Sequence, residues 1–497
     1  MQPYIIGVDI GTGSVKAVAL DKEGKVLAST QLHYEIISNQ PGYAEQDAAI
    51  IWNQFVSCIR NIVSTLKQAP SLISLSSYMH GIMAVDDKGV LLTNLITWAD
   101  TRSEKIALEI RQSAGSEDLY RATGAPIHSM LPLCKIKWLK ENEALIFEKS
   151  NRFISIKEYI WFRLFNVYEI DYSIAGATGL FNFHTRSWYQ PSLDICGIRT
   201  DQLSVPVETR LLRSKIQRSA ADVMGTDIGI NFCIGSSDGC LAVIGSGALG
   251  SGKAGLTIGT SGAIRLLNPL PVYHYPEMIF NYLLEDGIFI CGGPVNNGGN
   301  TIQWLLKTFW DKTKVTQDDY RQLFKYIEEI ATGSNGLLFL PYIHGERSPV
   351  WDEKASGVFV GIRPEHTKAH FSKAVLEGIC FGLNMVLELL NESIPIEQIN
   401  VSGGFTHAPG WLQLLSDISG KRLCLPHNED ASALGAAFIG MKSAGWIKDY
   451  NISVQSDAPI IEPDMENYKK YKDLFDVFKS LYGNLNGTMH QLYDLNK

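Results

Sequence analysis

Two short loops, rich in glycine and hydroxyl residues, have the composition of a phosphate-binding turn. The first is Gly11–Ser14 ("GTGS"), and the second is Gly259–Gly262 ("GTSG"), about half a chain later. Successive backbone N–H groups in such a turn form a concave nest for anionic oxygens, and Thr or Ser hydroxyls add donors. Lys16 would add a positive charge beside the first loop. Two such loops together can hold a polyphosphate.

Two aspartates end apolar stretches and lie next to small residues. Asp9 ends "YIIGVD", and Asp238 follows "FCIGSS". A carboxylate at the end of a buried strand is costly unless it is solvated, paired or bound to a metal ion. Asp is also a common turn cap, because its side chain accepts hydrogen bonds from nearby backbone. For Asp238 the local sequence leaves catalysis and capping equally open.

The stretches around both loops predict β-hairpins, not the strand–loop–helix arrangement of the common nucleotide-binding loops. Apolar, β-branched residues over 15–20 are followed by a turn at Asp21–Lys25 and by a second such stretch over 26–30. The loop at Gly259–Gly262 is flanked in the same way by "KAGLTI" and "AIRLL". This recurrence predicts a duplicated architecture, with one phosphate loop in each half of the chain.

The order of the remaining elements predicts an α/β fold in two domains. Strands and helices alternate in the first 100 residues, as they do in a layered α/β domain. The longest helical pattern covers 47–67 and places six apolar residues on one face: Ile50, Ile51, Phe55, Ile59, Ile62 and Val63. Residues 115–195 are richer in helical patterns and resemble a cap on that core. A strand–turn–helix pattern over 232–249 closes the first half, so we expect domains at 1–245 and 246–497.

The composition restricts the partners and the compartment. The chain has 497 residues, 45% of them hydrophobic, and a formal net charge of -8, which argues against nucleic-acid binding. No signal peptide or membrane-spanning stretch is evident, so we expect no membrane partner. The eight cysteines are scattered singly, which predicts neither a zinc site nor a disulfide framework and favours the cytoplasm. The sequence does not decide between a monomer and a homodimer.

Two longer motifs make the chain similar to the FGGY family of carbohydrate kinases, within the actin-like ATPases. They are "MLPLCKIKWLKEN" at 130–142 and "GVFVGIRPEHTKAHFSKAVLE" at 357–377. The two hairpin loops, "SSDG" and "SGGF" follow in the family's order, so the resemblance spans nearly the whole chain. It implies two actin-like (ribonuclease H-like) domains with a cleft between them, and transfer of the γ-phosphate of ATP to a sugar hydroxyl with Mg²⁺.

The resemblance also implies roles for individual residues. Asp238 is the general base that takes the proton from the sugar hydroxyl, Asp9 and Asp238 hold Mg²⁺, and Met79 and His80 border the sugar. The residues expected to contact ATP are small or carry a donor group: Thr12, Gly13, Ser14, Lys16, Gly259, Thr260, Gly299, Gln303, Gly403 and Gly404. His407–Ala408 departs from the small polar residue that often follows the family's glycine pair, which leaves the adenine contacts open there.

The acceptor is the least defined part of the resemblance. Segments such as "ITWADTRS" and "TGAPIHSMLPL" are similar to the branch that phosphorylates gluconate, whereas "MHG" is typical of xylulose kinases. Gluconate carries a carboxylate and requires a cation or amide donors, for which Arg102 and Lys157 are candidates. We expect gluconate, with xylulose as the alternative. A regulatory ATPase of the actin-like class, without a sugar acceptor, is the alternative of a different class.

Overall fold

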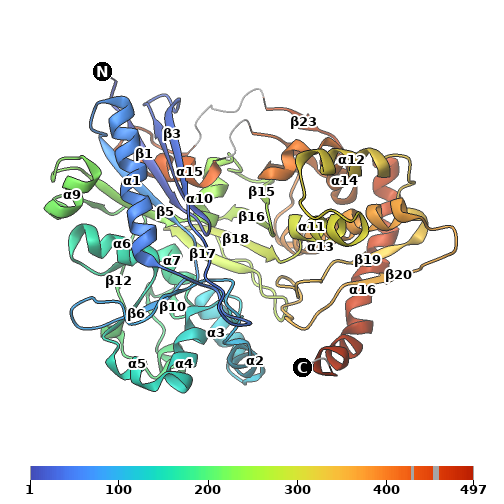
Figure 1. Ribbon diagram of the computed structural model, residues 1–497, viewed down its shortest axis with the longest axis horizontal. Helices are drawn as coiled ribbons and strands as arrows, with labels where there is room; N and C mark the ends of the chain where they lie inside the picture. Colours follow the sequence, from blue (N-terminus) through green and yellow to red (C-terminus); the bar gives the residue numbers. More distant parts are fainter. Residues whose placement is uncertain (1, 427–429, 451–457, 496–497) are drawn as a thin grey trace. The chain divides into compact units, whose positions relative to one another are not determined.

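The computed structural model describes residues 2–426, 430–450 and 458–495. The chain forms two compact units that are interleaved in sequence (Figure 1). Unit 1 contains Met1–Leu249, Asn268–Cys291 and Asp430–Val454, and unit 2 contains Gly250–Leu267, Gly292–Glu429 and Gln455–Lys497. Both units combine a mixed β-sheet with helices, so the predicted α/β class is confirmed.

Unit 1 is built on a six-stranded sheet in the order β13-β14-β5-β1-β2-β3. The bounds of its strands are β1 Ile5–Ile10, β2 Ser14–Leu20, β3 Val26–His33, β5 Leu72–Ser77, β13 Leu212–Arg213 and β14 Phe232–Ser237. Strands β1, β5 and β14 run parallel, and β1, β2 and β3 form the predicted antiparallel hairpins. The carboxyl ends of β1, β5 and β14 therefore meet at one edge of the sheet, which is where Asp9 and Asp238 lie.

Two helices cover opposite faces of this sheet. Helix α1 (Ala48–Leu66) starts at Asp47, whose side chain caps its first N–H groups, and packs on β2 and β3. The prediction for its apolar face is wrong at Ile50, which is 47% exposed because it lies on the side of the helix opposite to the buried Phe55, Ile59 and Ile62. Helix α15 (Ala431–Ser443) packs on β1 and β5, although it lies near the end of the chain (Figure 1).

Glycine permits the close packing of α15 in unit 1. A Cβ atom on Gly7 of β1 would lie 2.0 Å from the carbonyl oxygen of Ala433. A Cβ atom on Gly435 of α15 would lie 2.1 Å from the carbonyl oxygen of Leu241, in helix α10 (Asp238–Gly245). No side chain larger than hydrogen fits at these contacts. With both faces of β1 covered, its six residues read as the nearly continuous apolar stretch of a buried parallel strand.

The segment between β5 and β13 carries most of the other helices of unit 1, as predicted for 115–195. Its elements are β6 Met83–Val85, β7 Leu95–Ile96, α2 Glu104–Gln112, α3 Ser116–Thr123, α4 Pro132–Asn142, α5 Ala144–Lys149, β8 Arg152–Ile154, α6 Ile156–Phe165, β9 Glu169–Asp171, α7 Tyr172–Gly176, β10 Phe181–Asn182, β11 Ser187–Trp188, α8 Gln190–Cys196, a 3₁₀-helix Thr200–Gln202 and β12 Val205–Val207. Strand β17 (Phe280–Glu285) returns to this region and packs on α7.

Unit 2 contains strands in the order β16-β15-β21-β22-β23. Their bounds are β15 Lys253–Ile258, β16 Gly262–Asn268, β21 Gln398–Ser402, β22 Arg422–Cys424 and β23 Ile460–Ile461. Strands β15 and β16 form the predicted second hairpin, and β21 runs parallel to β15. Its helices are α11 Gly299–Phe309, α12 Gln317–Ile327, α13 Lys368–Ser393, α14 Pro409–Ser419 and α16 Met465–Leu495.

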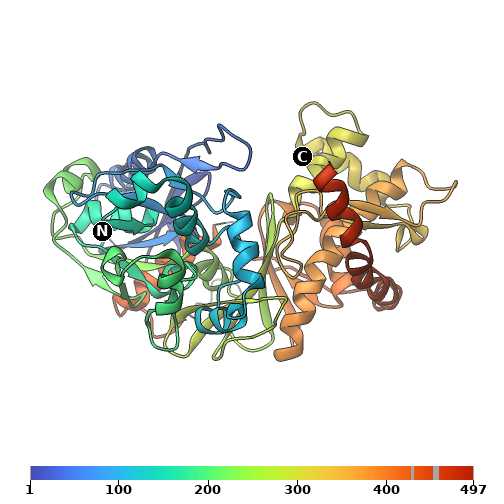
Figure 2. The ribbon, with the colours of Figure 1, turned by 90° about the horizontal axis from the view of Figure 1, so that it is seen from below.

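Helices α13, α14 and α16 pack on one another in unit 2 (Figure 2). Among the described residues, α13 is the one helix whose length and apolar composition would suffice to cross a membrane. Protein buries 72% of its most apolar window, and α11, α12 and β19 (Leu338–Leu340) also pack on it. This helix therefore has the surroundings of a core helix.

Candidate active site

The first glycine loop joins β1 to β2, and side chains of the same unit hydrogen-bond it. Trp98 donates from its indole nitrogen to the Thr12 hydroxyl at 2.8 Å, and Gln46 donates to the Thr12 carbonyl at 2.6 Å. The N–H of Gly11 bonds the carbonyl of Ser14 at 2.9 Å, which closes the turn. Among the described residues, the N–H groups of Thr12 and Gly13 have no acceptor. The loop thus presents free donors, as an anion nest does.

Three carboxylates, those of Asp9, Asp238 and Asp430, form an acid cluster in unit 1 together with the ammonium group of Lys16. Asp9 and Ser76 are register partners on β1 and β5, and the Ser76 hydroxyl donates to the Asp9 carboxylate at 2.6 Å. Burial and, secondarily, the negative charge of Asp238 raise the pKa of Asp9 to about 7. Lys16 forms an ion pair with Asp430, at the start of α15. Lys16 and Asp430 both act on the Asp9 carboxylate, with opposite effects on its pKa.

Asp238 is the first residue of α10, directly after β14. Its carboxylate accepts the N–H of Gly239 at 2.6 Å, while the preceding Ser237 caps the helix through the N–H of Cys240. The carboxylate is partly exposed and close enough to Asp9 to perturb the pKa of that group. The two alternatives raised by the sequence are therefore compatible, because a side chain that accepts from its own helix still faces the acid cluster.

His80 occupies a constrained position after β5. Its backbone has φ = 67°, a left-handed conformation that is uncommon outside glycine. The ring nitrogen Nδ1 lies 2.7 Å from the carbonyl oxygen of Ala177, and Nε2 lies 3.4 Å from the Tyr282 hydroxyl. Lys135 of α4 donates to the carbonyl of His80 at 2.7 Å. Three groups from distant segments thus fix this histidine, and the adjacent Met79 is half-buried.

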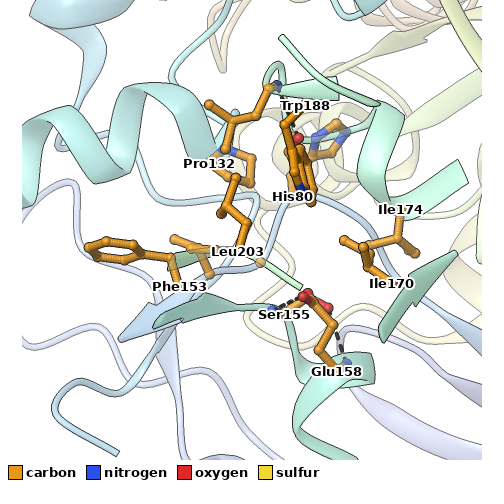
Figure 3. Close-up of a pocket in the computed structure, with 13 residues that line it drawn as sticks. His80, Pro132, Phe153, Ser155, Glu158, Ile170, Ile174, Trp188 and Leu203 are labelled. Atoms are coloured by element: carbon orange, nitrogen blue, oxygen red, sulfur yellow. Dashed lines mark hydrogen bonds between the residues drawn. The ribbon is translucent and has the colours of Figure 1, made fainter. Parts of the chain in front are cut away.

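The space behind His80 is a small pocket with mostly apolar walls (Figure 3). Its accessible volume of about 10 Å³ accommodates roughly one water molecule, so a sugar does not fit there. The acid in its wall, Glu158, belongs to the capping box of α6 with Ser155. Burial raises the pKa of Glu158 to about 7. His80 forms part of the wall of this pocket, and we assign the pocket no substrate.

Unit 2 brings together the glycines of its own predicted site. The N–H of Gly299, at the start of α11, bonds the carbonyl of Gly259 at 2.9 Å, and the N–H of Asn300 bonds that of Thr260 at 3.1 Å. A Cβ atom on Gly299 would lie 2.6 Å from the Gly259 carbonyl. Gly403 has φ = 102°, and a Cβ atom there would lie 2.3 Å from the carbonyl of Ile258. The end of β15 thus lies so close to the end of β21 and to the start of α11 that only glycine fits at Gly299 and Gly403.

Two other predicted residues of unit 2 lie near these glycines in sequence. Gln303 is one turn beyond Gly299 on α11 and hydrogen-bonds the Tyr320 side chain. Gly404 begins a short 3₁₀-helix, and a Cβ atom there would meet no atom within 4 Å. His407 is exposed.

Comparisons with known proteins agree with this geometry. The sequence models for the N-terminal and C-terminal domains of the FGGY family of carbohydrate kinases match residues 4–245 and 254–444. The chain belongs to the FGGY family of carbohydrate kinases. FGGY kinases are phosphotransferases that use ATP and a small sugar or sugar-derived substrate, so this chain is an enzyme of that class.

Individual FGGY relatives cover essentially the whole chain. The gluconokinase of Bacillus subtilis (strain 168) is 37% identical over 99% of this chain and 98% of its own length. The xylulose kinase of the same organism is 31% identical over 96% of both chains. Among solved structures, the gluconate kinase from Lactobacillus acidophilus has a TM-score of 0.93 at 32% identity, covering 99% of this chain and 100% of that one.

In this FGGY chain, both cations considered for a substrate carboxylate are paired internally. Arg102 binds Asp100 through two nitrogens, at 2.7 and 2.9 Å, and Glu45 at 2.5 Å, and it stacks on a tyrosine ring. Lys157 is buried and donates to Asp171 at 2.6 Å. Asp100 lies only two residues before Arg102, but Glu45 and Asp171 lie on other elements, so their contacts are not readable from the sequence.

Sequence reasoning missed two acids of this FGGY kinase. Asp430 was not considered, and only the packing of α15 on unit 1 brings it to Lys16. Glu346 is buried in unit 2 and accepts the N–H of Asn296 at 2.5 Å and the amide of Asn297 at 3.0 Å. Burial raises its pKa to about 7. Glu346 thereby holds the turn that leads into Gly299. Its only sequence signal is a charge within "HGERSP" that lies between apolar stretches.

Proposed function

We propose that this kinase phosphorylates D-gluconate at its terminal hydroxyl, with ATP as donor and 6-phosphogluconate and ADP as products, in the cytoplasm. The observation that carries the proposal is full-length similarity: two gluconokinases are 37% and 36% identical to the chain. The xylulose kinases of Bacillus subtilis and Staphylococcus epidermidis, which align with 96% and 97% of this chain, are 31% and 28% identical to it. Membership in a family of carbohydrate kinases argues against a regulatory ATPase without an acceptor.

Asp238 is the proposed general base. Its carboxylate would accept the proton of the sugar hydroxyl, whose oxygen then forms a bond to the γ-phosphorus as the bond to the ADP oxygen breaks. This role is supported by the position of Asp238 directly after the carboxyl end of β14, beside the acid cluster and the first glycine loop. Residues 1–245 would supply the base, the sugar side with Met79 and His80, and the phosphate contacts of 12–16. Residues 246–497 would supply the nucleotide side.

The proposed contacts to ATP follow the two loops. In residues 1–245, Thr12, Gly13, Ser14 and Lys16 would bind the phosphates through the free N–H groups, the hydroxyls and the ammonium group. In the second half, Gly259, Thr260, Gly299 and Gly403 would let the nucleotide approach bare backbone, with Gln303 and Gly404 beside them. Bare backbone at a strand end or a helix start suits a phosphate, because donors point outward and no side chain intervenes.

Asp9 and Asp238 are the proposed Mg²⁺ carboxylates. The residues fit this ion. Burial and the nearby charge of Asp238 raise the pKa of Asp9, and a bound cation would stabilise the ionised form of this carboxylate. Within the described residues, no three or more His, Cys, Asp or Glu side chains are arranged to enclose a metal. Mg²⁺ is usually held by one or two carboxylates, waters and substrate phosphates, so it needs no such cage. When bound, it would neutralise charge on the transferring phosphoryl group.

D-Xylulose is the second candidate acceptor. Two observations favour it: "MHG" at 79–81, and a xylulose kinase structure from Lactobacillus acidophilus with a TM-score of 0.92 at 32% identity. That match is as close in identity as the match to the gluconate kinase structure.

An acceptor panel tests the proposal. ADP release with ATP and Mg²⁺ is measured with D-gluconate, D-xylulose, glycerol and other aldonates, and kcat/KM is compared. We expect gluconate to exceed every other acceptor by at least about tenfold, a difference of about 1.4 kcal/mol in transition-state binding. A higher kcat/KM for xylulose would overturn the gluconate assignment. ADP release that no acceptor stimulates would overturn the proposed acceptor activity. The Asp238→Asn variant, prepared identically, serves as the background control.

A further inference from the structure

Three buried polar residues lie directly beneath the strand end that carries Asp238. Lys157 is on α6, Asp171 ends β9 and caps α7, and Ser173 lies in the first turn of α7. They are 2%, 0% and 0% exposed, respectively. Buried polar groups of this kind are stable only when they are hydrogen-bonded to one another or to backbone.

The direction of each hydrogen bond in this group follows from its donors. The ionised Asp171 carboxylate only accepts, so the Ser173 hydroxyl, 2.5 Å from Oδ1, must donate to it. That hydroxyl has no second proton, so it accepts from the Ser236 hydroxyl at 2.7 Å and from the N–H of Ser237 at 2.8 Å. Lys157 donates to Asp171 Oδ2 at 2.6 Å and to the carbonyl of Ser236 at 3.1 Å. Both residues that precede Asp238 are thus bound from this side.

Strand β14 needs such support because its end is irregular. The register with β5 shifts between Cys233 and Ser236, and Gly235 has φ = 66°. A Cβ atom at Gly235 would lie 1.8 Å from the carbonyl oxygen of Leu75. A bulge interrupts the ladder that otherwise fixes a strand, so the direction of the chain after it depends on side contacts.

We propose that Lys157, Asp171 and Ser173 are positioning residues that hold Ser236 and Ser237, and through them set the place of the Asp238 carboxylate. This inference rests on the proposed role of Asp238 as the base. It also replaces the expectation that Lys157 binds a substrate carboxylate, because its ammonium group is engaged in this network. The three side chains act on Asp238 through the backbone and do not touch the substrate.

Ser173→Ala is the central test, because it removes one hydroxyl and leaves both charges paired. We expect kcat to fall by about 10- to 100-fold, with the KM values for acceptor and ATP within about threefold of wild type. Ser236→Ala removes only one donor to Ser173 and should cause a smaller fall in kcat. If Ser173→Ala does not fold, Ser236→Ala decides by the same criteria. The matched control is Ser150→Ala, a buried serine whose hydroxyl bonds the carbonyl of Ile146, and it should leave kcat within about twofold.

A double-mutant cycle separates positioning from a merely structural role. If Ser173 acts through the Asp238 carboxylate, Ser173→Ala should lower kcat by less than about threefold in an Asp238→Asn background. The same fold-loss in both backgrounds, or an unchanged kcat for Ser173→Ala alone, would overturn the positioning role only. A near-normal kcat for Asp238→Asn itself would instead overturn the base assignment, and the positioning role with it.

Discussion

Lys135 allows a sharp prediction about stability, because its side chain is completely buried next to His80. It donates to the carbonyl oxygens of His80 and Thr97, each at 2.7 Å. Burial lowers the pKa of Lys135 to about 7, an effect that the negative charge of Asp100 only partly offsets. Lys135→Met keeps a long, unbranched side chain and removes both the donor and the charge.

The pH dependence of this substitution follows from the two protonation states. Above about pH 7 the folded chain loses the Lys135 proton, whereas the unfolded chain keeps it up to its ordinary pKa of 10.5. The unfolded state then binds more protons, so the stability of the wild type rises with pH, by at most about 1.4 kcal/mol per pH unit. Below pH 7 both states are protonated and this gain is absent. Lys135→Met does not titrate, so its deficit against wild type should grow by about 2–3 kcal/mol between pH 7 and 9.

Urea titrations of both proteins at pH 7 and pH 9, followed by tryptophan fluorescence, measure this difference. At both pH values the two orphaned carbonyls should each cost about 1–3 kcal/mol. At pH 7, where Lys135 is still partly protonated in the folded state, relief of the buried charge offsets part of this cost. Lys137→Met, on the same helix but only paired with Glu141 near the surface, is the matched control and should show no such pH dependence. A deficit for Lys135→Met that is equal at both pH values would refute the lowered pKa. Loosening of the His80 backbone should also raise the KM for the acceptor.

Three further predictions concern Asp238, Gly403 and Asp9. Asp238→Asn should lower kcat by about 10²–10⁴ while calorimetry shows gluconate affinity changed less than tenfold; a variant within tenfold of wild-type kcat would reduce Asp238 to a cap. Gly403→Ala forces a Cβ atom against the Ile258 carbonyl, so the KM for ATP should rise more than tenfold. The control is Gly410→Ala in α14, where the methyl group has room, and it should leave the KM for ATP unchanged. Asp9→Asn should require more Mg²⁺ for half-maximal rate. Because the raised pKa of Asp9 makes its ionised form unfavourable in the fold, the melting temperature of Asp9→Asn relative to wild type should be higher at pH 8 than at pH 5.5.

The hairpins, the strand ends and the glycine turns were predictable because their signals are local. A β-branched stretch followed by "DKEGK" specifies β2, its turn and β3 without knowledge of any other segment. Gly299 and Gly403 were expected beside ATP only through the family resemblance, because a glycine after a strand can equally serve tight packing. The charged residues beside these turns, Asp9, Asp238 and Lys16, could be named from the sequence, but the residues that they contact could not.

The remaining contacts depend on segments far apart in sequence. Lys16 meets Asp430 across 414 positions, and Lys157 donates to the carbonyl of Ser236 across 79 positions. Ile50 lies opposite the buried face of α1, although it is as apolar as its buried neighbour Ile51, so residue type alone did not show that it is exposed. Such contacts depend on tertiary packing, which the periodicity of a single segment does not reveal.

The interleaving of unit 1 has a consequence for how the protein is made. When the first 249 residues have left the ribosome, one face of β1 still lacks its cover, because α15 is translated roughly 190 residues later. At ~5–20 residues per second this delay is on the order of 10–40 s, much longer than small domains take to fold. The nascent N-terminal half therefore exposes the backbone around Gly7 and the apolar surface of α10 for that interval. Separate expression of 1–245 should yield an aggregating fragment, and a chaperone binding site during synthesis is expected on this face.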